Sequence, residues 1–191
     1  KMNGLGNDFL IFDSRAKNLQ IDSHFVVSLA NRHFGVGFDQ LAVIHKSPLA
    51  NVSASLKFWN ADGTSSVTCG NATRCIAKLL MEQYKTSEIV LSSNHTILKC
   101  IKLKNGSIAV NMGKALCSWQ EIPLSKACDT LHLPIKGDPV ATSIGNPHCT
   151  FFVNSIETHN IEEFGEMYEN HALFPARTNV QIAEILDNKT I

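Results

Sequence analysis

One spacing occurs twice in this 191-residue chain, and it constrains the fold more than any other feature. Gly6-Asn7 and Gly145-Asn146 each lead into an apolar stretch typical of a β-strand. Gln40 follows Asn7 by 33 positions, Asn179 follows Asn146 by 33 positions, and each opens another strand-like stretch after a helical pattern. We interpret this repetition as an internal duplication, which predicts two halves with the same order of elements.

The first half reads as strands arranged around one principal helix. Asp22 or Ser23 can cap a short first helix whose apolar residues share one face. The principal helix is predicted over residues 72–83, where apolar residues recur at helical spacing. Strands are predicted over residues 7–13, 40–45, 53–59, 88–92, 96–103 and 108–112, the last after an Asn105-Gly106 hairpin turn. The pattern favours an antiparallel β arrangement.

A domain boundary is predicted between residues 113 and 136, where periodicity is weak and prolines occur. The expected domains are residues 1–115 and 116–191. In the second, we expect an apolar strand after Gly145, a helix over residues 160–171 and a strand over residues 179–186. Mixed strands and helices in this order indicate the α+β fold class.

Composition excludes several kinds of partner. Seventeen basic residues balance seventeen acidic ones, and no basic stripe with interleaved aromatic residues occurs, so we expect no binding to nucleic acid or anionic membranes. No apolar run approaches the roughly 20 residues that span a bilayer, and no signal peptide precedes the first strand, so we expect a cytoplasmic protein. Six scattered cysteines without a CxxC pair favour reduced thiols and argue against a metal site.

The segment from Asn60 to Cys75 joins a turn, a nucleophile and the start of the principal helix. Cys69 lies where the loop enters that helix, and the first amides of a helix have no internal partners. Those amides and the positive end of the helix dipole stabilise a thiolate, which predicts a lowered pKa for Cys69. Gly70 and Asn71 add two backbone N–H groups beside the sulfur, and Gly70 has no side chain to keep a ligand away. We therefore predict a carboxylate-binding site here.

Four blocks of the sequence resemble the diaminopimelate epimerase family: residues 2–9, 32–40, 60–75 and 145–148. The resemblance runs the whole length of the chain but covers only about the first two thirds of a family member. It implies two similar, pseudo-symmetric domains, each a β-barrel-like sheet around a central helix, with substrate in the cleft between them. It also implies a cofactor-independent reaction that interconverts LL- and meso-diaminopimelate in lysine and peptidoglycan biosynthesis.

The same resemblance implies roles for individual residues. Cys69 matches one of two catalytic cysteines that face each other across the reacting carbon, and Gly70 and Asn71 match its carboxylate cradle. The polar substrate contacts carry over onto Asn7, Gln40, Asn60, Asn146 and Asn179. By analogy with the family, a homodimer is expected.

The family's later Glu-Arg-Gly block and second Cys-Gly block have no counterpart in this sequence. Inverting a carbon needs two groups, because a single base would mostly return the proton to the face it came from. Cys75 lies about 600° further around the helix than Cys69 and so points to the opposite side, which favours a core position. Strand alternation turns Cys149 away from Asn146. The second domain is therefore expected to be incomplete, and this chain to be inactive alone.

Two other functions stay open. One is a truncated homologue that binds a substrate or a partner protein without chemistry. The other is a related racemase or isomerase of the same fold, such as the proline racemases or the phenazine-pathway proteins, whose blocks match residues 60–75 less well. His148 either orients a bound carboxylate or has a structural role at the Pro147 turn. Arg74 and Asp39 are interpreted as structural.

Overall fold

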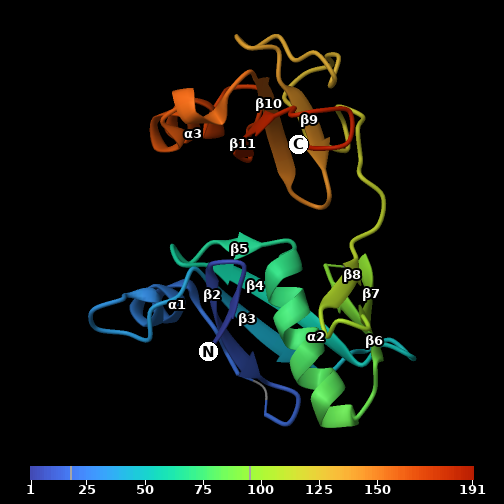
Figure 1. The fold of residues 1–191 in the computed structure, drawn as a ribbon. Helices are drawn as coiled ribbons and strands as arrows, with labels where there is room; N and C mark the ends of the chain where they lie inside the picture. Colours follow the sequence, from blue (N-terminus) through green and yellow to red (C-terminus); the bar gives the residue numbers. More distant parts are fainter. Residues whose placement is uncertain (18, 95) are drawn as a thin grey trace. The chain divides into compact units, whose positions relative to one another are not determined.

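The computed structural model describes residues 1–17, 19–94 and 96–191, which divide into two compact units. Unit 1 is Lys1–Gly113 and unit 2 is Lys114–Ile191. Each unit has its own sheet (Figure 1). In these described ranges, unit 1 contains two hydrophobic cores and unit 2 contains one. Both units combine strands and helices, so the predicted α+β class is confirmed. Within the described residues, no helix is both long and apolar enough to cross a membrane.

Unit 1 is built on a curled, mixed sheet. In spatial order its main path is β1 (Met2–Gly4), β2 (Asn7–Asp13), β3 (Gln40–His45), β4 (Ala54–Asn60), β6 (Glu88–Ser93), β7 (Thr96–Lys102) and β8 (Ile108–Asn111), and β5 (Ser65–Ser66) pairs with β4. Two neighbouring pairs, β2 with β3 and β4 with β6, are parallel, so the expected antiparallel arrangement is wrong for them. The reason is that helix α1 (Ser23–Ala30) lies in the first connection and α2 (Gly70–Tyr84) in the second, and such crossovers allow parallel pairing.

The two helices of unit 1 pack against different sets of strand residues. Successive strand residues point to opposite faces, so Phe9 and Leu10 belong to separate cores. Phe9 packs in the core that contains α2, and Leu10 packs in the core that contains α1. Full burial of each large apolar side chain contributes roughly 1.5–3 kcal/mol, so covering both faces stabilises the sheet substantially.

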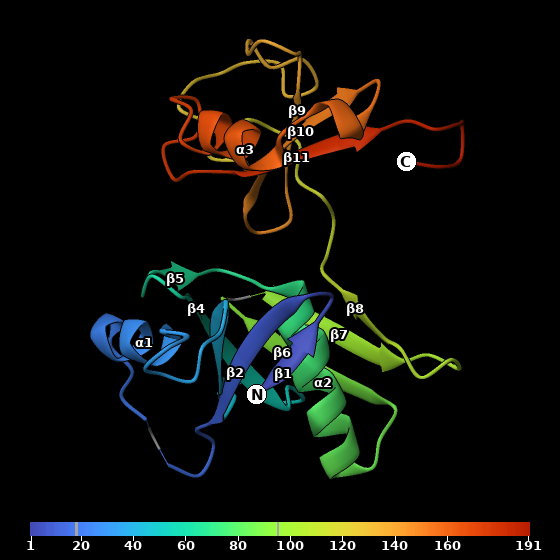
Figure 2. The same cartoon turned by 60° about the vertical axis from the view of Figure 1, so that its left-hand side comes forward.

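Helix α2 is longer than its predicted range of 72–83, because its caps extend it at both ends. Cys69 is the N-cap, and the helix ends at Tyr84, which is followed by the C-cap Lys85 in a left-handed conformation with φ 53°. Asp22, one of two predicted caps, caps α1 by accepting a hydrogen bond from the Phe25 amide at 2.8 Å. Figure 2 shows α2 lying along the sheet with its first turn at the same end as β5.

Unit 2 has a smaller sheet in which β10 (Pro147–Val153) lies between β9 (Val140–Ser143) and β11 (Asn179–Glu184). A short 3-10 helix, η1 (Ile156–Thr158), and helix α3 (Ile161–Glu169) precede β11. Phe164 and Tyr168 of α3 pack on Phe151, with ring centroids 4.8 and 4.6 Å apart. Residues 114–139 form turns and loops that supply further core residues, including Ile122.

The repeated spacing corresponds to a repeated arrangement. Strands β2 and β3 are parallel with Phe9 opposite Gln40, and strands β10 and β11 are parallel with His148 opposite Asn179. Phe9 and His148 each lie two positions after the asparagine of a Gly-Asn pair, which is Asn7 in unit 1 and Asn146 in unit 2. Gly6 and Gly145 take φ values of 91° and 108°, which favour glycine. Along the chain, each pair is connected through one α-helix, which is α1 for β2 and β3 and α3 for β10 and β11.

Candidate functional site

Polar residues of unit 1 gather at one end of three adjacent strands. Asn7 opens β2, Gln40 opens β3 and Asn60 ends β4. Gln40 lies opposite Phe9 in one pair and opposite Asn60 in the other. Paired residues project from the same face, and Asn7 shares that face with Phe9. This is the face on which α2 packs. The polar positions therefore lie on the same face of the sheet as the helix that begins after Cys69.

Gln40 and Asn60 belong to a hydrogen-bond chain within unit 1. The side-chain nitrogen of Gln40 donates to Asn60 Oδ1 at 2.9 Å, and Asn60 Nδ2 donates to Thr64 Oγ1 at 3.0 Å. Thr64 Oγ1 donates in turn to Asp62 Oδ1 at 2.5 Å. The turn itself closes through the Gly63 amide, which donates to the Asn60 carbonyl at 3.0 Å. Both amide side chains are therefore held in fixed orientations, which suits them to recognise a polar ligand.

Cys69 occupies the helix start that the sequence predicts. Its sulfur accepts a hydrogen bond from the Ala72 amide at 3.4 Å. Its carbonyl oxygen accepts from the Thr73 amide at 2.9 Å and from Thr73 Oγ1 at 2.8 Å. The residue is half-buried beside the core beneath α2. The thiol is therefore fixed at the first turn of a helix and remains partly accessible.

The protonation of Cys69 differs from the prediction. Burial raises the pKa of the Cys69 thiol above its ordinary value, and hydrogen bonds from the Ala72 and Asn71 amides offset only part of this effect. The predicted lowering is wrong because desolvation of the thiolate outweighs the helix-terminus interactions. At neutral pH the group is therefore a thiol, which is the form that gives a proton.

Gly70 and Asn71 form the first turn of α2. A Cβ atom added at Gly70 would lie 3.7 Å from the sulfur of Met112, an ordinary contact, so the position has room for a small group. Asn71 Oδ1 accepts a hydrogen bond from Arg74, which gives Arg74 the structural role that the sequence predicts. A Cβ atom at Gly4 would lie 3.4 Å from the Asn71 carbonyl oxygen, so the β1–β2 hairpin packs closely on this turn.

An ion-pair cluster fixes the strand ends next to Asn7 and Gln40. Arg32 contacts Asp8 at 3.0 Å and Asp39 at 2.8 Å. The Asp8 amide donates to Asp39 Oδ2 at 2.7 Å. The Arg32 guanidinium holds the pKa of Asp8 at about 2, with help from Asn3 and Lys1. Asp39 therefore has the structural role that the sequence predicts.

Unit 2 contains a second polar group. His148 Nε2 lies 3.1 Å from Asn146 Oδ1, and His148 Nδ1 lies 2.7 Å from the side-chain nitrogen of Gln181. Asn179 Nδ2 donates to the Pro147 carbonyl at 2.9 Å, so its side chain ties β11 to β10. Burial lowers the pKa of His148. The motif at residues 145–148 is therefore part of a hydrogen-bonded network.

The two faces of the unit 2 sheet differ in character. Cys149 and Val180 pack in the core with α3, whereas the neighbouring residues His148 and Asn179 project from the other face. The predicted orientation of Cys149 away from Asn146 is thus confirmed. Sequence reasoning missed Gln181, although its position two residues after Asn179 on one strand gave a usable signal.

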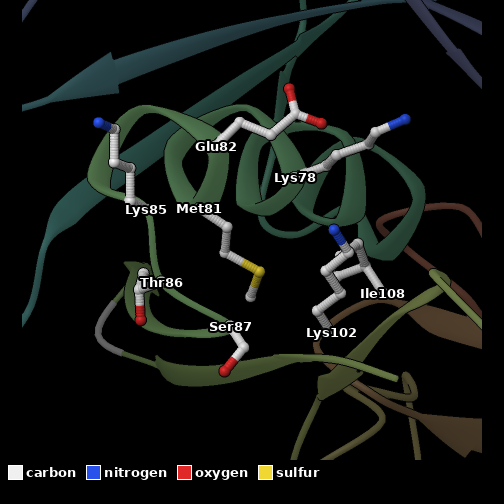
Figure 3. A pocket seen from close by; sticks show the side chains of 8 residues that line it. All are labelled: Lys78, Met81, Glu82, Lys85, Thr86, Ser87, Lys102 and Ile108. Carbon is white, nitrogen blue, oxygen red and sulfur yellow. The ribbon is translucent and has the colours of Figure 1, made fainter. Parts of the chain in front are cut away.

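Two cavities are found among the described residues of unit 1. One, of about 300 Å³, lies at the far end of α2, and Figure 3 shows Met81 pointing into it while the amino groups of Lys78 and Lys85 point apart. The other, of about 560 Å³, includes Trp59 and Ser93 in its wall. Cys69 is not among the described residues that line either cavity. Within the described part of the chain, no group of three or more metal-ligating side chains is found.

Known proteins match nearly all of this chain. The family model for diaminopimelate epimerase matches residues 1–117. Diaminopimelate epimerase of a Wolbachia strain from Drosophila simulans is 45% identical over 190 residues, covering 97% of this chain and 70% of the relative. The enzymes of Rhodospirillum centenum and Pelagibacter ubique are 36% and 38% identical, with 65% and 72% of their lengths covered. The chain thus spans about two thirds of the length of these curated relatives.

Solved structures resemble this fold at low sequence identity. A phenazine biosynthesis protein of Bacillus anthracis aligns with a TM-score of 0.56 at 16% identity, covering 99% of this chain and 66% of that protein. A hydroxyproline epimerase of Agrobacterium vitis aligns with a TM-score of 0.53 at 11% identity, covering 81% of this chain and 52% of that protein. At such identities the likeness concerns the fold alone.

Proposed function

Because the chain belongs to the diaminopimelate epimerase family, we propose that it takes part in the interconversion of LL- and meso-diaminopimelate through proton transfer at Cys69. The observation that carries this proposal is the position of Cys69 at the start of α2, on the sheet face that also carries Gln40 and Asn60. The reaction serves lysine and peptidoglycan biosynthesis in the cytoplasm and needs no cofactor.

The residues around Cys69 have distinct roles in this proposal. The Cys69 thiol gives a proton to the α-carbon on one face, and its thiolate removes the proton in the reverse direction. The amides of Gly70 and Asn71 bind the substrate carboxylate at the helix start and stabilise the enolate-like charge that develops there. The side chains of Asn7, Gln40 and Asn60 bind the polar groups of the substrate.

The proposal extends to unit 2, where Asn146 and Asn179 also bind the substrate. Residues 1–115 act as the domain that carries the first catalytic cysteine, and residues 116–191 are part of a second domain of the same plan. The matching positions of Asn7 and Asn146, and of Gln40 and Asn179, in two parallel strand pairs support this view. A homodimer is the assembly that we expect.

Inversion requires a second acid or base on the opposite face of the carbon. Among the other cysteines, Cys75, Cys100 and Cys149 are buried, and burial raises the pKa of Cys100 to about 11 and that of Cys149 to about 12. These three side chains lie within the hydrophobic cores, where a substrate carbon cannot reach them, whereas Cys69 is only half-buried. Cys117 and Cys128 lie in none of the four blocks that resemble the family. We therefore propose that residues 1–191 alone do not invert diaminopimelate.

The test is substitution of Cys69 in the product of the intact gene, followed by chiral chromatography of diaminopimelate. Cys69→Ser keeps a capping oxygen at the start of α2 and controls for folding, whereas Cys69→Ala removes the sulfur that accepts the Ala72 N–H. Both variants should lose roughly 10²- to 10⁴-fold in rate. Cys117→Ala, at an exposed position, should keep the full rate. Full activity in a folded Cys69→Ala variant would refute the proposal.

A second candidate function is binding without chemistry, which the raised pKa of Cys69 favours because little thiolate exists at neutral pH. Isothermal titration with diaminopimelate separates the two functions. The binding-only alternative predicts heat of binding, but no inversion by the product of the intact gene. The epimerase predicts both.

A further inference from the structure

Four side chains of unit 2 form one continuous hydrogen-bond relay across β10 and β11. Thr150 Oγ1 donates to Gln181 Oε1 at 3.0 Å. The Gln181 side-chain nitrogen lies 2.7 Å from His148 Nδ1, and His148 Nε2 lies 3.1 Å from Asn146 Oδ1. The relay therefore ends on one of the residues that we propose to bind substrate.

The chemistry of these groups determines the direction of the relay. An amide nitrogen only donates, so the nitrogen of Gln181 requires His148 Nδ1 to be an unprotonated acceptor. An amide oxygen only accepts, so Asn146 Oδ1 requires a proton on His148 Nε2. The two amides contact different nitrogens of the imidazole ring, and both contacts require the same neutral tautomer, with the proton on Nε2. The hydroxyl of Thr150 fits as well, because it donates to the oxygen of Gln181.

The repeated architecture carries different residues at these positions in its two units. The positions of unit 1 that correspond to His148 and Gln181 carry Phe9 and Ala42, which have the same places in the strand register and pack beneath α2. The corresponding residue to Thr150 is Ile11, directly opposite Ala42. Apolar side chains therefore occupy these strand positions in unit 1, whereas hydrogen-bonded polar side chains occupy them in unit 2.

We propose that Gln181 is a positioning residue that holds His148 as the neutral Nε2–H tautomer and thereby orients Asn146. With its oxygen engaged by His148, Asn146 presents its amide nitrogen as a donor, which suits a carboxylate of the substrate. This inference rests on the proposed function, because it assigns a direction to the contact between Asn146 and the substrate. No covalent step is involved, and Gln181 acts only through His148.

The tautomer is measured directly by long-range ¹H–¹⁵N NMR of the histidine rings in the 191-residue chain at neutral pH. A His148→Phe variant, which introduces the residue found at the corresponding position of unit 1, assigns the His148 signals. We expect a protonated Nε2 and an unprotonated Nδ1 in the unsubstituted chain. A protonated Nδ1 in that chain would overturn the proposal.

Two substitutions of Gln181 sharpen this test. In Gln181→Glu the ionised carboxylate can only accept, so Nδ1 should gain a proton. In Gln181→Leu, which is similar in size but cannot hydrogen-bond, the two tautomers should mix. The exposed His132 ring, which contacts Asp138, is the internal control and should not change. Unaltered His148 spectra in both variants, with the fold intact by the remaining amide signals, would also overturn the proposal.

Titration with diaminopimelate separates this inference from the proposed function. Gln181→Leu should weaken binding about 2- to 10-fold, the usual effect of losing one neutral hydrogen bond, and Asn146→Ala should weaken it at least as much. Absence of binding to the unsubstituted chain would count against the proposed function, whereas the NMR result decides the relay independently. Unchanged binding in Gln181→Leu beside weakened binding in Asn146→Ala would contradict the positioning role.

Discussion

Gln40 and Asn60 lie directly opposite each other on antiparallel strands β3 and β4, with Gln40 Nε2 2.9 Å from Asn60 Oδ1. The same asparagine is tied to Thr64, so the two amides form one rigid unit at the edge of the proposed site. A ligand that binds there meets groups whose orientation is already set. The energetic cost of ordering them is therefore met during folding rather than on binding.

This coupling predicts non-additive effects on binding. Gln40→Leu and Asn60→Leu should each weaken diaminopimelate binding, and the double variant should lose less than the sum of the two single losses. Neighbouring residues that share a network usually show coupling of about 0.5–3 kcal/mol. Isothermal titration of the four proteins measures it. Strictly additive losses would show that the two amides act independently.

The reactivity of Cys69 should follow its burial rather than its place at a helix start. Because burial raises the pKa of Cys69, its thiolate forms only at a pH above the ordinary range for cysteine. We expect the rate of Cys69 alkylation by iodoacetamide to rise only toward the alkaline end of a pH series from 7 to 11. Mass spectrometry of the Cys69 peptide measures this rate at each pH. A midpoint below the ordinary cysteine pKa would contradict the structure.

Acid sensitivity should arise in part from Asp8. Its pKa is lowered from 3.8 to about 2 by Arg32, Asn3 and Lys1 in the folded chain. Since the folded value lies below the unfolded one, this contribution to stability is fully present above pH 3.8 and is lost as pH falls toward 2. Asp8→Asn should therefore reduce the drop in melting temperature across that window. Glu88→Gln, at an exposed position of β6, is the control and should leave the drop unchanged.

Gly70 allows stability and binding to be separated. A methyl group there would meet only Met112 at ordinary contact distance, and alanine favours helix over glycine by up to about 1 kcal/mol. Gly70→Ala should therefore fold at least as well as the unsubstituted chain by urea denaturation. If the amides at this turn bind the substrate carboxylate, the added methyl group should weaken binding roughly tenfold, or about 1.4 kcal/mol. Full affinity in this variant would indicate that the substrate carboxylate does not bind at this turn.

Much of the architecture could be predicted because its signals are local. The start of α2 after Cys69 and the equal spacings from Asn7 to Gln40 and from Asn146 to Asn179 are visible in the sequence. The short strands β1 and β5 were missed because three and two residues carry too little alternation to be recognised.

The errors concern properties that depend on tertiary structure. The parallel pairing of β2 with β3 depends on the path of the connection through α1, and the helix pattern alone does not specify that path. The pKa of Cys69 depends on how deeply its neighbours bury the sulfur. Likewise, the contact between Gln181 and His148 depends on the register of β10 and β11. Hydrogen bonding across strands is set by register, which a single sequence specifies weakly.

In the proposed reaction, Cys69 exchanges a proton with the α-carbon of diaminopimelate. The most direct measurement incubates the product of the intact gene with LL-diaminopimelate in deuterated water and follows mass and stereochemistry at that carbon. If Cys69 is the exchanging group, each molecule inverted during early turnover should carry one solvent-derived deuterium. The Cys69→Ala variant should introduce none, and residues 1–191 alone should give no inversion. Inversion with deuterium uptake by Cys69→Ala, or by the 191-residue chain itself, would contradict the proposal.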